Sequence, residues 1–238
     1  MAKVGRPPQD PARQLERAHR ILDAVTELVL RWGYDKTTID DVAQRAGVAK
    51  GTIYLHWKTR DDIFAALLRR ERVLLLTEVR DQAPATLSEL FGEYARVLLR
   101  RPLLRAVLGG DSEVLGKLSR RKRGGPTGFE LGAPFNGYVT ELVKHGAVRE
   151  DPGDHVVVIG SIVYGFLFLP DGRPAGDRPT EDRIADLVAD TIERALGTGR
   201  PPSDPDAATR ATLAFLDAMV EVAQQRLALS LGSKERVK

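Results

Sequence analysis

The chain has 238 residues and a mass of 26.2 kDa, and 42% of its residues are hydrophobic, which excludes an extended disordered chain. It has no cysteine, which excludes disulfides and thiolate chemistry, and its four scattered histidines lead us to expect neither a metal nor a cofactor. Residues 1–60 carry 11 basic and 7 acidic side chains while the remainder is almost neutral, so any polyanion is expected to meet the N-terminal quarter.

No segment of the sequence is both long and apolar enough for a membrane span. The longest apolar run, 156–170, is interrupted by two glycines and a serine and falls short of the ~20 residues that a span needs. The first ten residues have no apolar core of the kind found in secretory signals. We therefore expect a soluble, cytoplasmic protein without membrane contact.

Helical periodicity extends over almost the whole chain, and no stretch alternates with the period of two that strands require. The sequence predicts an all-α fold of about ten helices. The first helix is expected over 11–32, because Asp10 is a good N-cap residue, Pro11 suits the first turn and Gly33 follows the last. Thr38 and Asp41 then form a capping-box pattern that opens a second, short helix.

The rest of the chain divides at similar signals. A third short helix is expected over 49–57, and the Thr59–Asp62 capping pattern opens a long helix to about residue 80. Further helices are expected near 86–101, 103–108, 112–121, 129–145, 156–169, 180–196 and 205–231. Loops rich in proline, glycine or basic residues are expected at 120–128 and 170–179.

Residues 37–60 predict a helix-turn-helix, because a short capped helix, a turn containing Gly47 and a second short helix follow one another. The second helix presents small and polar residues outward, which allows it to approach base edges in a major groove. Lys50 is placed to donate to guanine, and Tyr54 and His56 to donate to phosphates. The alternatives are a packing role for Tyr54 and a merely solvated His56.

The stretch TTIDDVAQRAGVAKGTIYLHWKTRDDIFAALL, at 37–68, closely resembles the DNA-binding signature of the TetR family of transcriptional regulators. The resemblance is dense over about residues 15–70 and only architectural beyond them. It implies an N-terminal three-helix DNA-binding unit followed by a C-terminal helical ligand-binding and dimerisation domain. Carried over residue by residue, it implies DNA contacts at Thr38, Lys50, Gly51, Thr52, Tyr54, His56 and Lys58.

Two positions depart from the family pattern. Ala49 stands where a capping serine is usual, so a cap worth ~1 kcal/mol is expected to be missing. Trp57 stands where phenylalanine is usual, and we expect it to plug the core against the first helix. In the N-terminal arm, Arg6 lies between Gly5 and Pro7 in a pattern that suits insertion into a minor groove, and the alternative is a solvated tail.

The expected domains are a basic arm at 1–10, a helix-turn-helix domain at 11–58 and an effector-binding and dimerisation domain at 59–238. By the resemblance, helices near 156–169 and 184–196 form the homodimer interface, and the apolarity of the first on all sides is typical of an interface in its own right. The extra C-terminal helix, 205–231, is expected either to pack over the dimer seam or to cover the effector pocket.

Aromatic and apolar residues accompanied by isolated polar groups are the candidates for that pocket. They are Phe91, Tyr94, Leu98, Phe135, Asn136, Tyr164 and Phe168. The alternative for each of them is a position in the core. Because no Asp/His pair at helical spacing indicates a magnesium chelate, we expect a small, mainly apolar organic effector.

Together these features predict a transcriptional regulator, a repressor by the habit of the family, that binds a palindromic double-stranded operator as a homodimer. A small effector is expected to release it by displacing the helix at 61–80. The alternative is a ligand-independent DNA-binding or architectural protein. We expect no enzyme, because the sequence lacks a nucleophile motif, a metal-ligand cluster and a phosphate loop.

Overall fold

The computed structural model describes residues 10–116, 132–151, 153–169 and 174–231, and Arg6 and the basic loop at 120–128 lie outside these ranges. In the described ranges all named elements are helical, which confirms the predicted all-α fold. The α-helices are α1 (Pro11–Trp32), α2 (Ile39–Ala46), α3 (Lys50–His56), α4 (Arg60–Asp81), α5 (Leu87–Leu99), α6 (Pro102–Gly109), α7 (Ser112–Leu115), α9 (Gly132–Lys144), α10 (His155–Phe168), α11 (Glu181–Leu196) and α12 (Pro205–Ser230).

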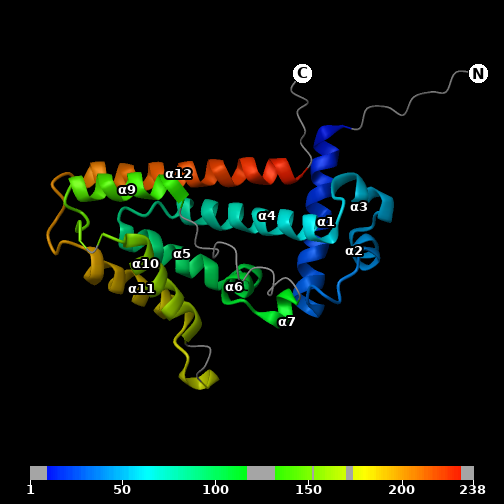
Figure 1. Ribbon diagram of the computed structural model, residues 1–238, viewed down its shortest axis with the longest axis horizontal. Coiled ribbons are helices and arrows are strands. Elements are labelled where there is room, and N and C mark those ends of the chain that lie inside the picture. The colour runs from blue at the N-terminus through cyan, green and yellow to red at the C-terminus, as the bar shows by residue number, and fades with distance from the viewer. Residues whose placement is uncertain (1–9, 117–131, 152, 170–173, 232–238) are drawn as a thin grey trace, which may run out of the picture.

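The helices form an elongated molecule with a small helical unit at one end (Figure 1). Helices α1, α2 and α3 make up this end, and α4 leads away from it along the long axis of the molecule. Helix α12 returns along α4 and α9, so that its C-terminus lies beside α1 and α3. Helices α10 and α11 pack together and against α5 on the opposite part of the molecule.

Local capping explains where the first helices begin. The Asp10 carboxylate accepts a hydrogen bond from the Ala12 backbone N–H at 3.0 Å. Both predicted capping boxes are present at Thr38 and Thr59, where each threonine and the acid three residues later bond to each other's backbone. Thr86 and Glu89 have the same spacing, which predicts a third box, but only half of it forms: the Thr86 hydroxyl accepts from the Glu89 N–H, while the Glu89 carboxylate accepts from the Ala85 N–H.

Two hydrophobic cores meet in α4. Ile63, Phe64 and Leu67 belong to the core of the N-terminal unit, together with residues of α1, α2 and α3. About two to three turns later, Leu75 and Val79 belong to the core of the larger domain. Because the same 22-residue helix contributes to both cores, no flexible linker separates the two parts.

A buried arginine fixes α4 against α1. The Arg70 side chain on α4 donates to the His19 carbonyl at 3.1 Å, to the Asp23 carboxylate at 2.7 Å and to the Thr26 hydroxyl at 3.2 Å. Arg70 is only 8% exposed, so these bonds replace most of the water that its guanidinium has lost. The angle between α1 and α4 is therefore set by polar contacts as well as by packing.

Helix α12 packs along the molecule and is not a free tail. At the middle of α12 the Asp217 carboxylate accepts from Arg80 of α4 at 2.7 Å. At its end the Ser230 carbonyl accepts from the indole Nε1–H of Trp57 at 2.9 Å. The extra C-terminal helix thus connects the larger domain directly to the residue that follows α3. Within the described ranges, no helix combines the length and the apolarity needed to cross a membrane.

Replacing Arg70 by alanine is expected to lower the free energy of unfolding by about 2 kcal/mol, because it removes three bonds and leaves a cavity between α1 and α4. Urea denaturation followed by circular dichroism measures this loss. Asp23→Ala is the matched control and is expected to cost less than ~1 kcal/mol, since the Asp23 side chain is mostly exposed. An equal loss in both variants would contradict this account.

Candidate DNA interface and effector cavity

The α2–turn–α3 unit is held by a small set of buried residues. Val42 and Ala43 of α2 pack with Ile53 of α3 in the N-terminal core, and Trp57 is buried beside them, as predicted. Gly47 ends α2 with φ of 64°, a left-handed conformation that glycine adopts without strain. Ala49 makes no side-chain cap bond at the start of α3, which agrees with the missing cap expected there.

The opposite face of α3 stands clear of the rest of the protein. Lys50, Gly51 and Lys58 are exposed, Thr52 is half-buried and Tyr54 is 48% exposed, which excludes the alternative that Tyr54 is a core residue. Leu55, which was not among the predicted contacts, is 68% exposed on this surface. A Cβ atom added at Gly51 would meet nothing within 4 Å, so no internal packing requires that glycine.

Acidic groups from α2 partner the cations and donors of this surface. The Lys50 ammonium lies 2.9 Å from the Asp40 carboxylate, and this hydrogen bond raises the pKa of Lys50. Thr38 is exposed, but its N–H and its hydroxyl both donate to Asp41, whose pKa is lowered by these bonds. The Thr38 donors that the family resemblance assigns to a phosphate are therefore already used in this conformation.

His56 is turned differently from its neighbours on α3. It is half-buried, its ring lies 5.3 Å from that of Trp57, and it bonds to the backbone of Leu231 at the end of α12. Burial, followed by the nearby charge of Arg17, lowers the pKa of His56. The structure thus places His56 between α3 and α12, and not on the open face with Lys50 and Tyr54.

Arg60, at the start of α4, contacts the loop between α1 and α2 inside the N-terminal unit. Its guanidinium donates to the Tyr34 carbonyl at 3.2 Å and to the Thr37 carbonyl at 3.0 Å, and it lies 4.1 Å from the centre of the Tyr34 ring. The Tyr34 hydroxyl in turn donates to Asp61. These contacts bind the loop between α1 and α2 to the first turn of α4.

A cavity of about 400 Å³ lies in the larger domain between α4, α5, α6 and α12. Its apolar wall includes the predicted residues Phe91, Tyr94 and Leu98 of α5, and Phe215 and Met219 of α12. Burial raises the pKa of Tyr94 to about 12, so its hydroxyl stays protonated at neutral pH. Helix α12 therefore covers the pocket, which is one of the two positions that the sequence left open for it.

The four other predicted pocket residues do not line this cavity. Phe135 is buried behind it, with its ring 6.2 Å from that of Phe91 and 5.7 Å from that of Phe215. Asn136 is exposed on α9, because consecutive helical residues point about 100° apart. The Tyr164 hydroxyl donates to the Leu108 carbonyl at 2.7 Å, and the Phe168 ring packs against Gly109.

Three cationic residues of the cavity wall were not anticipated. They are Arg69, Arg72 and Arg226. The first two lie three residues apart on α4, but the third lies more than 150 residues away in sequence, on α12. Only the packing of α12 along α4 reveals that they share one cavity.

The sequence and the fold both match known regulators. The sequence profile described as "Bacterial regulatory proteins, tetR family" matches residues 21–67, from within α1 into α4. The "Fatty acid metabolism regulator protein" of Bacillus subtilis is 38% identical over 52 residues, which cover 22% of this chain and 27% of that protein. The HTH-type transcriptional repressor KstR of Mycolicibacterium smegmatis is 32% identical over 116 residues, 44% of this chain and 57% of its own length.

A longer match comes from an HTH-type transcriptional repressor of Mycobacterium tuberculosis, which is 34% identical over 196 residues. The match covers 78% of this chain and 92% of that protein. A crystal structure described as a TetR-family transcriptional regulator from Mesorhizobium loti has the same fold, with a TM-score of 0.54, 19% identity, and coverage of 78% of this chain and 98% of that one. With a relative of this identity along most of its length, the chain belongs to the TetR family of bacterial transcriptional regulators.

Proposed function

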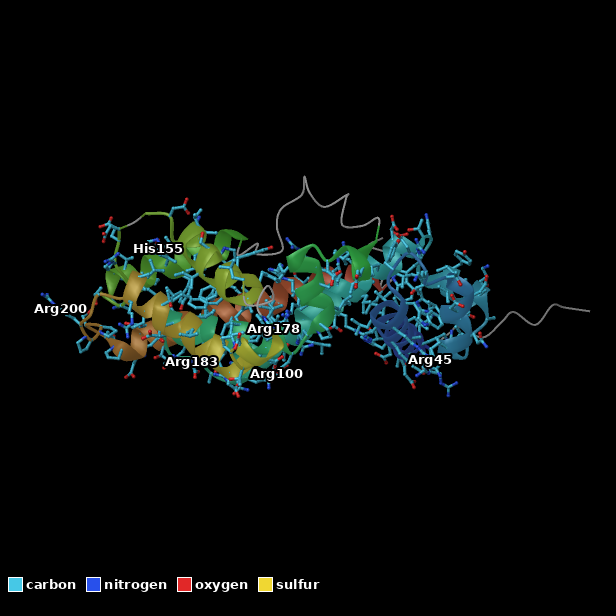
Figure 2. The ribbon with its side chains drawn as sticks, turned by 90° about the horizontal axis from the view of Figure 1, so that it is seen from below. Arg45, Arg100, His155, Arg178, Arg183 and Arg200 are labelled. Atoms are coloured by element: carbon cyan, nitrogen blue, oxygen red, sulfur yellow. The ribbon has the colours of Figure 1, made fainter. Side chains whose placement is uncertain are left out.

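We propose that the protein is a transcriptional repressor that binds a palindromic operator as a homodimer and leaves it when a small organic effector fills the cavity. The observation that carries this proposal is the open face of α3, where Lys50, Gly51 and Tyr54 are exposed on a rigidly packed helix-turn-helix. This face lies at the same end of the molecule as Arg45 of α2, far from His155 and Arg200 (Figure 2).

The chemistry of the α3 face suits a major groove. Gly51 allows the backbone to approach base edges, and Lys50 donates to guanine once it exchanges Asp40 for the base. Thr52 and Leu55 offer methyl groups to thymine, and the Tyr54 hydroxyl donates to a phosphate. Lys58, exposed after the end of α3, adds a second phosphate contact.

Helices α10 and α11 are the proposed dimer interface. Val157, Ser161, Gly165 and Leu169 follow one another at intervals of four, so they form one ridge along α10. Val157 is 59% exposed and Leu169 is 78% exposed, which leaves apolar area uncovered in the single chain. The small residues between them allow a second helix to approach closely, and a twofold axis there places two α3 helices for successive grooves, ~34–36 Å apart.

The proposed release of DNA follows from the position of the cavity. Its wall includes Leu75 and Val79 of α4, the helix whose first half packs under α2 and α3. An effector that fits better when α4 is displaced favours a different spacing of the two α3 helices, and a coupling of ~1–3 kcal/mol is enough to release DNA. The cavity favours this proposal over the ligand-independent alternative, which has no use for it. Repression as the direction of control rests on the relatives that are named repressors.

Lys50→Ala is expected to weaken binding to the operator by roughly 10- to 100-fold, because it removes a base contact worth ~1–3 kcal/mol. Fluorescence anisotropy of labelled DNA from upstream of the protein's own gene, read at two salt concentrations, measures the affinity and its salt dependence.

Lys144→Ala is the matched control, because it removes an exposed lysine from α9 and should leave the affinity unchanged. Asp40→Asn separates the base contact from the ion pair, since it frees Lys50 and is expected to preserve or increase the affinity. Equal binding by wild type and Lys50→Ala would show that an element other than α3 recognises the DNA sequence. Failure to bind any palindromic fragment would refute the operator assignment.

Ser161→Arg is expected to dissociate the dimer, because a long cation in the middle of the α10 ridge prevents close approach of a second helix and is costly to bury. Sedimentation velocity at micromolar concentration distinguishes one chain from two. Leu229→Arg is the matched control. It introduces an arginine at an exposed position of α12, outside the α10 ridge, and should leave the dimer intact. A dimer that persists in Ser161→Arg would place the interface elsewhere.

A further inference from the structure

The cavity between α4 and α12 has a cationic end and an apolar end. Among the described residues that line it, three are arginines and none is acidic. Arg69 and Arg72 lie near the middle of α4, after the lining residue Leu68, and Leu75, Leu76 and Val79 follow them along the same helix. From Arg69 onward, the lining residues of α4 therefore run from charged to apolar with increasing distance from the DNA-binding unit.

Helix α12 repeats this order in the opposite chain direction. Arg226 lies near its C-terminus, and Ala223, Met219 and Phe215 precede it along the cavity. Because α12 returns along α4 toward α3, its arginine reaches the same end of the cavity as those of α4 (Figure 1). Two helices that are distant in sequence thus impose the same polarity on one cavity.

A hydrogen bond confirms that the two helices meet at the cationic end. Arg69 of α4 donates to the Ser230 hydroxyl of α12 at 2.5 Å. The same hydroxyl donates to the carbonyl of Arg226, one turn earlier, at 2.8 Å. The Ser230 hydroxyl therefore links the Arg69 side chain to the backbone of Arg226.

The bonding of Arg69 differs from that of two other arginines on α4. Arg70 and Arg80 each form an ion pair with a carboxylate, on Asp23 and Asp217 respectively. Arg69 instead bonds a neutral hydroxyl. Arg72 also lines the cavity, and its charge acts on the buried hydroxyl of Tyr94 on the facing helix α5. The cavity wall therefore holds a cation and a neutral hydrogen-bond donor close together.

We propose that the effector is an amphipathic organic carboxylate, held with its anionic head at Arg69, Arg72 and Arg226 and its apolar body against Leu76, Leu98 and Met219. This inference rests on the proposed function and specifies the class of its effector. It adds a charged head to the small, mainly apolar molecule that the sequence led us to expect. Guanidinium groups suit a carboxylate because they offer planar, paired donors and are weakly hydrated.

The head of such a ligand lies near the joint between α12 and the DNA-binding unit. One turn beyond Arg226, the Ser230 carbonyl accepts the hydrogen bond from Trp57, which directly follows α3. An anion that draws Arg69 away from the Ser230 hydroxyl therefore acts on the turn that contacts Trp57. This position gives the charged head, and not only the apolar body, a route to α3.

The test compares three ligands that have the same ten-carbon chain and differ in charge: decanoate, decanol and decylamine. Isothermal titration of the full chain, below the concentrations at which the ligands form micelles, is expected to give at least tenfold tighter binding for decanoate than for decanol. Decylamine is expected to bind most weakly. Arg226→Gln and Arg69→Gln should each weaken decanoate roughly tenfold and leave decanol unchanged, because only the charge interaction is removed.

Arg210→Gln is the matched control, because it removes an exposed arginine near the start of α12, outside the cavity, and it should bind all three ligands as the wild type does. Equal affinity for decanoate and decanol, no binding of any of the three, or a decanoate affinity that survives both cavity variants would each overturn the carboxylate assignment. Anisotropy with operator DNA separates the two proposals. Arginine-dependent binding of decanoate that leaves the DNA bound would support the site and contradict the proposed release.

Discussion

The arrangement of this protein depends on one helix that belongs to two cores. Ile63 and Leu67 of α4 are packed with the helix-turn-helix, and Val79 of the same helix is packed with the larger domain. An unbroken helix transmits displacement because bending it would cost backbone hydrogen bonds. Arg70 and the Tyr34–Asp61 contact bind α1 and its following loop to α4, so the N-terminal unit is expected to follow this helix as one body.

Helix α12 adds a second connection that runs alongside the first. The Arg80–Asp217 pair holds its middle to α4, and the Trp57–Ser230 bond holds its C-terminal end to the N-terminal unit. The cavity lies between these two helices, and both of them continue to the base of α3. In the proposed release, a ligand that separates the two walls changes both connections together.

The sequence predicts what neighbouring residues decide and misses what distant packing decides. Helix starts at Asp10, Thr38 and Thr59 follow from caps that lie within three residues, and they were predicted at the right positions. Spacing also predicts the exposed face of α3, except at His56, which lies against the end of α12. The pocket was predicted only in part, because three candidates share the α5 face that lines it, while the others lie on α9 and α10, whose orientation depends on long-range contacts. The arginines of the cavity were missed for the same reason, since Arg226 meets Arg69 only through the return of α12.

The charges around α3 bear on why a small movement suffices in the proposed complex. Asp40 and Asp41 flank the surface that carries Lys50, so repulsion of phosphates offsets part of the attraction that a more basic surface would have. The Lys50–Asp40 pair is exposed to solvent, so it is weak and yields readily to a base. Affinity then depends on the register of α3 in the groove more than on summed charge. An interface dominated by charge tolerates a shift of the protein along the DNA, whereas an interface that depends on base contacts loses all of them together. In the proposed complex, the position of α3 that α4 and α12 set therefore controls the affinity for DNA.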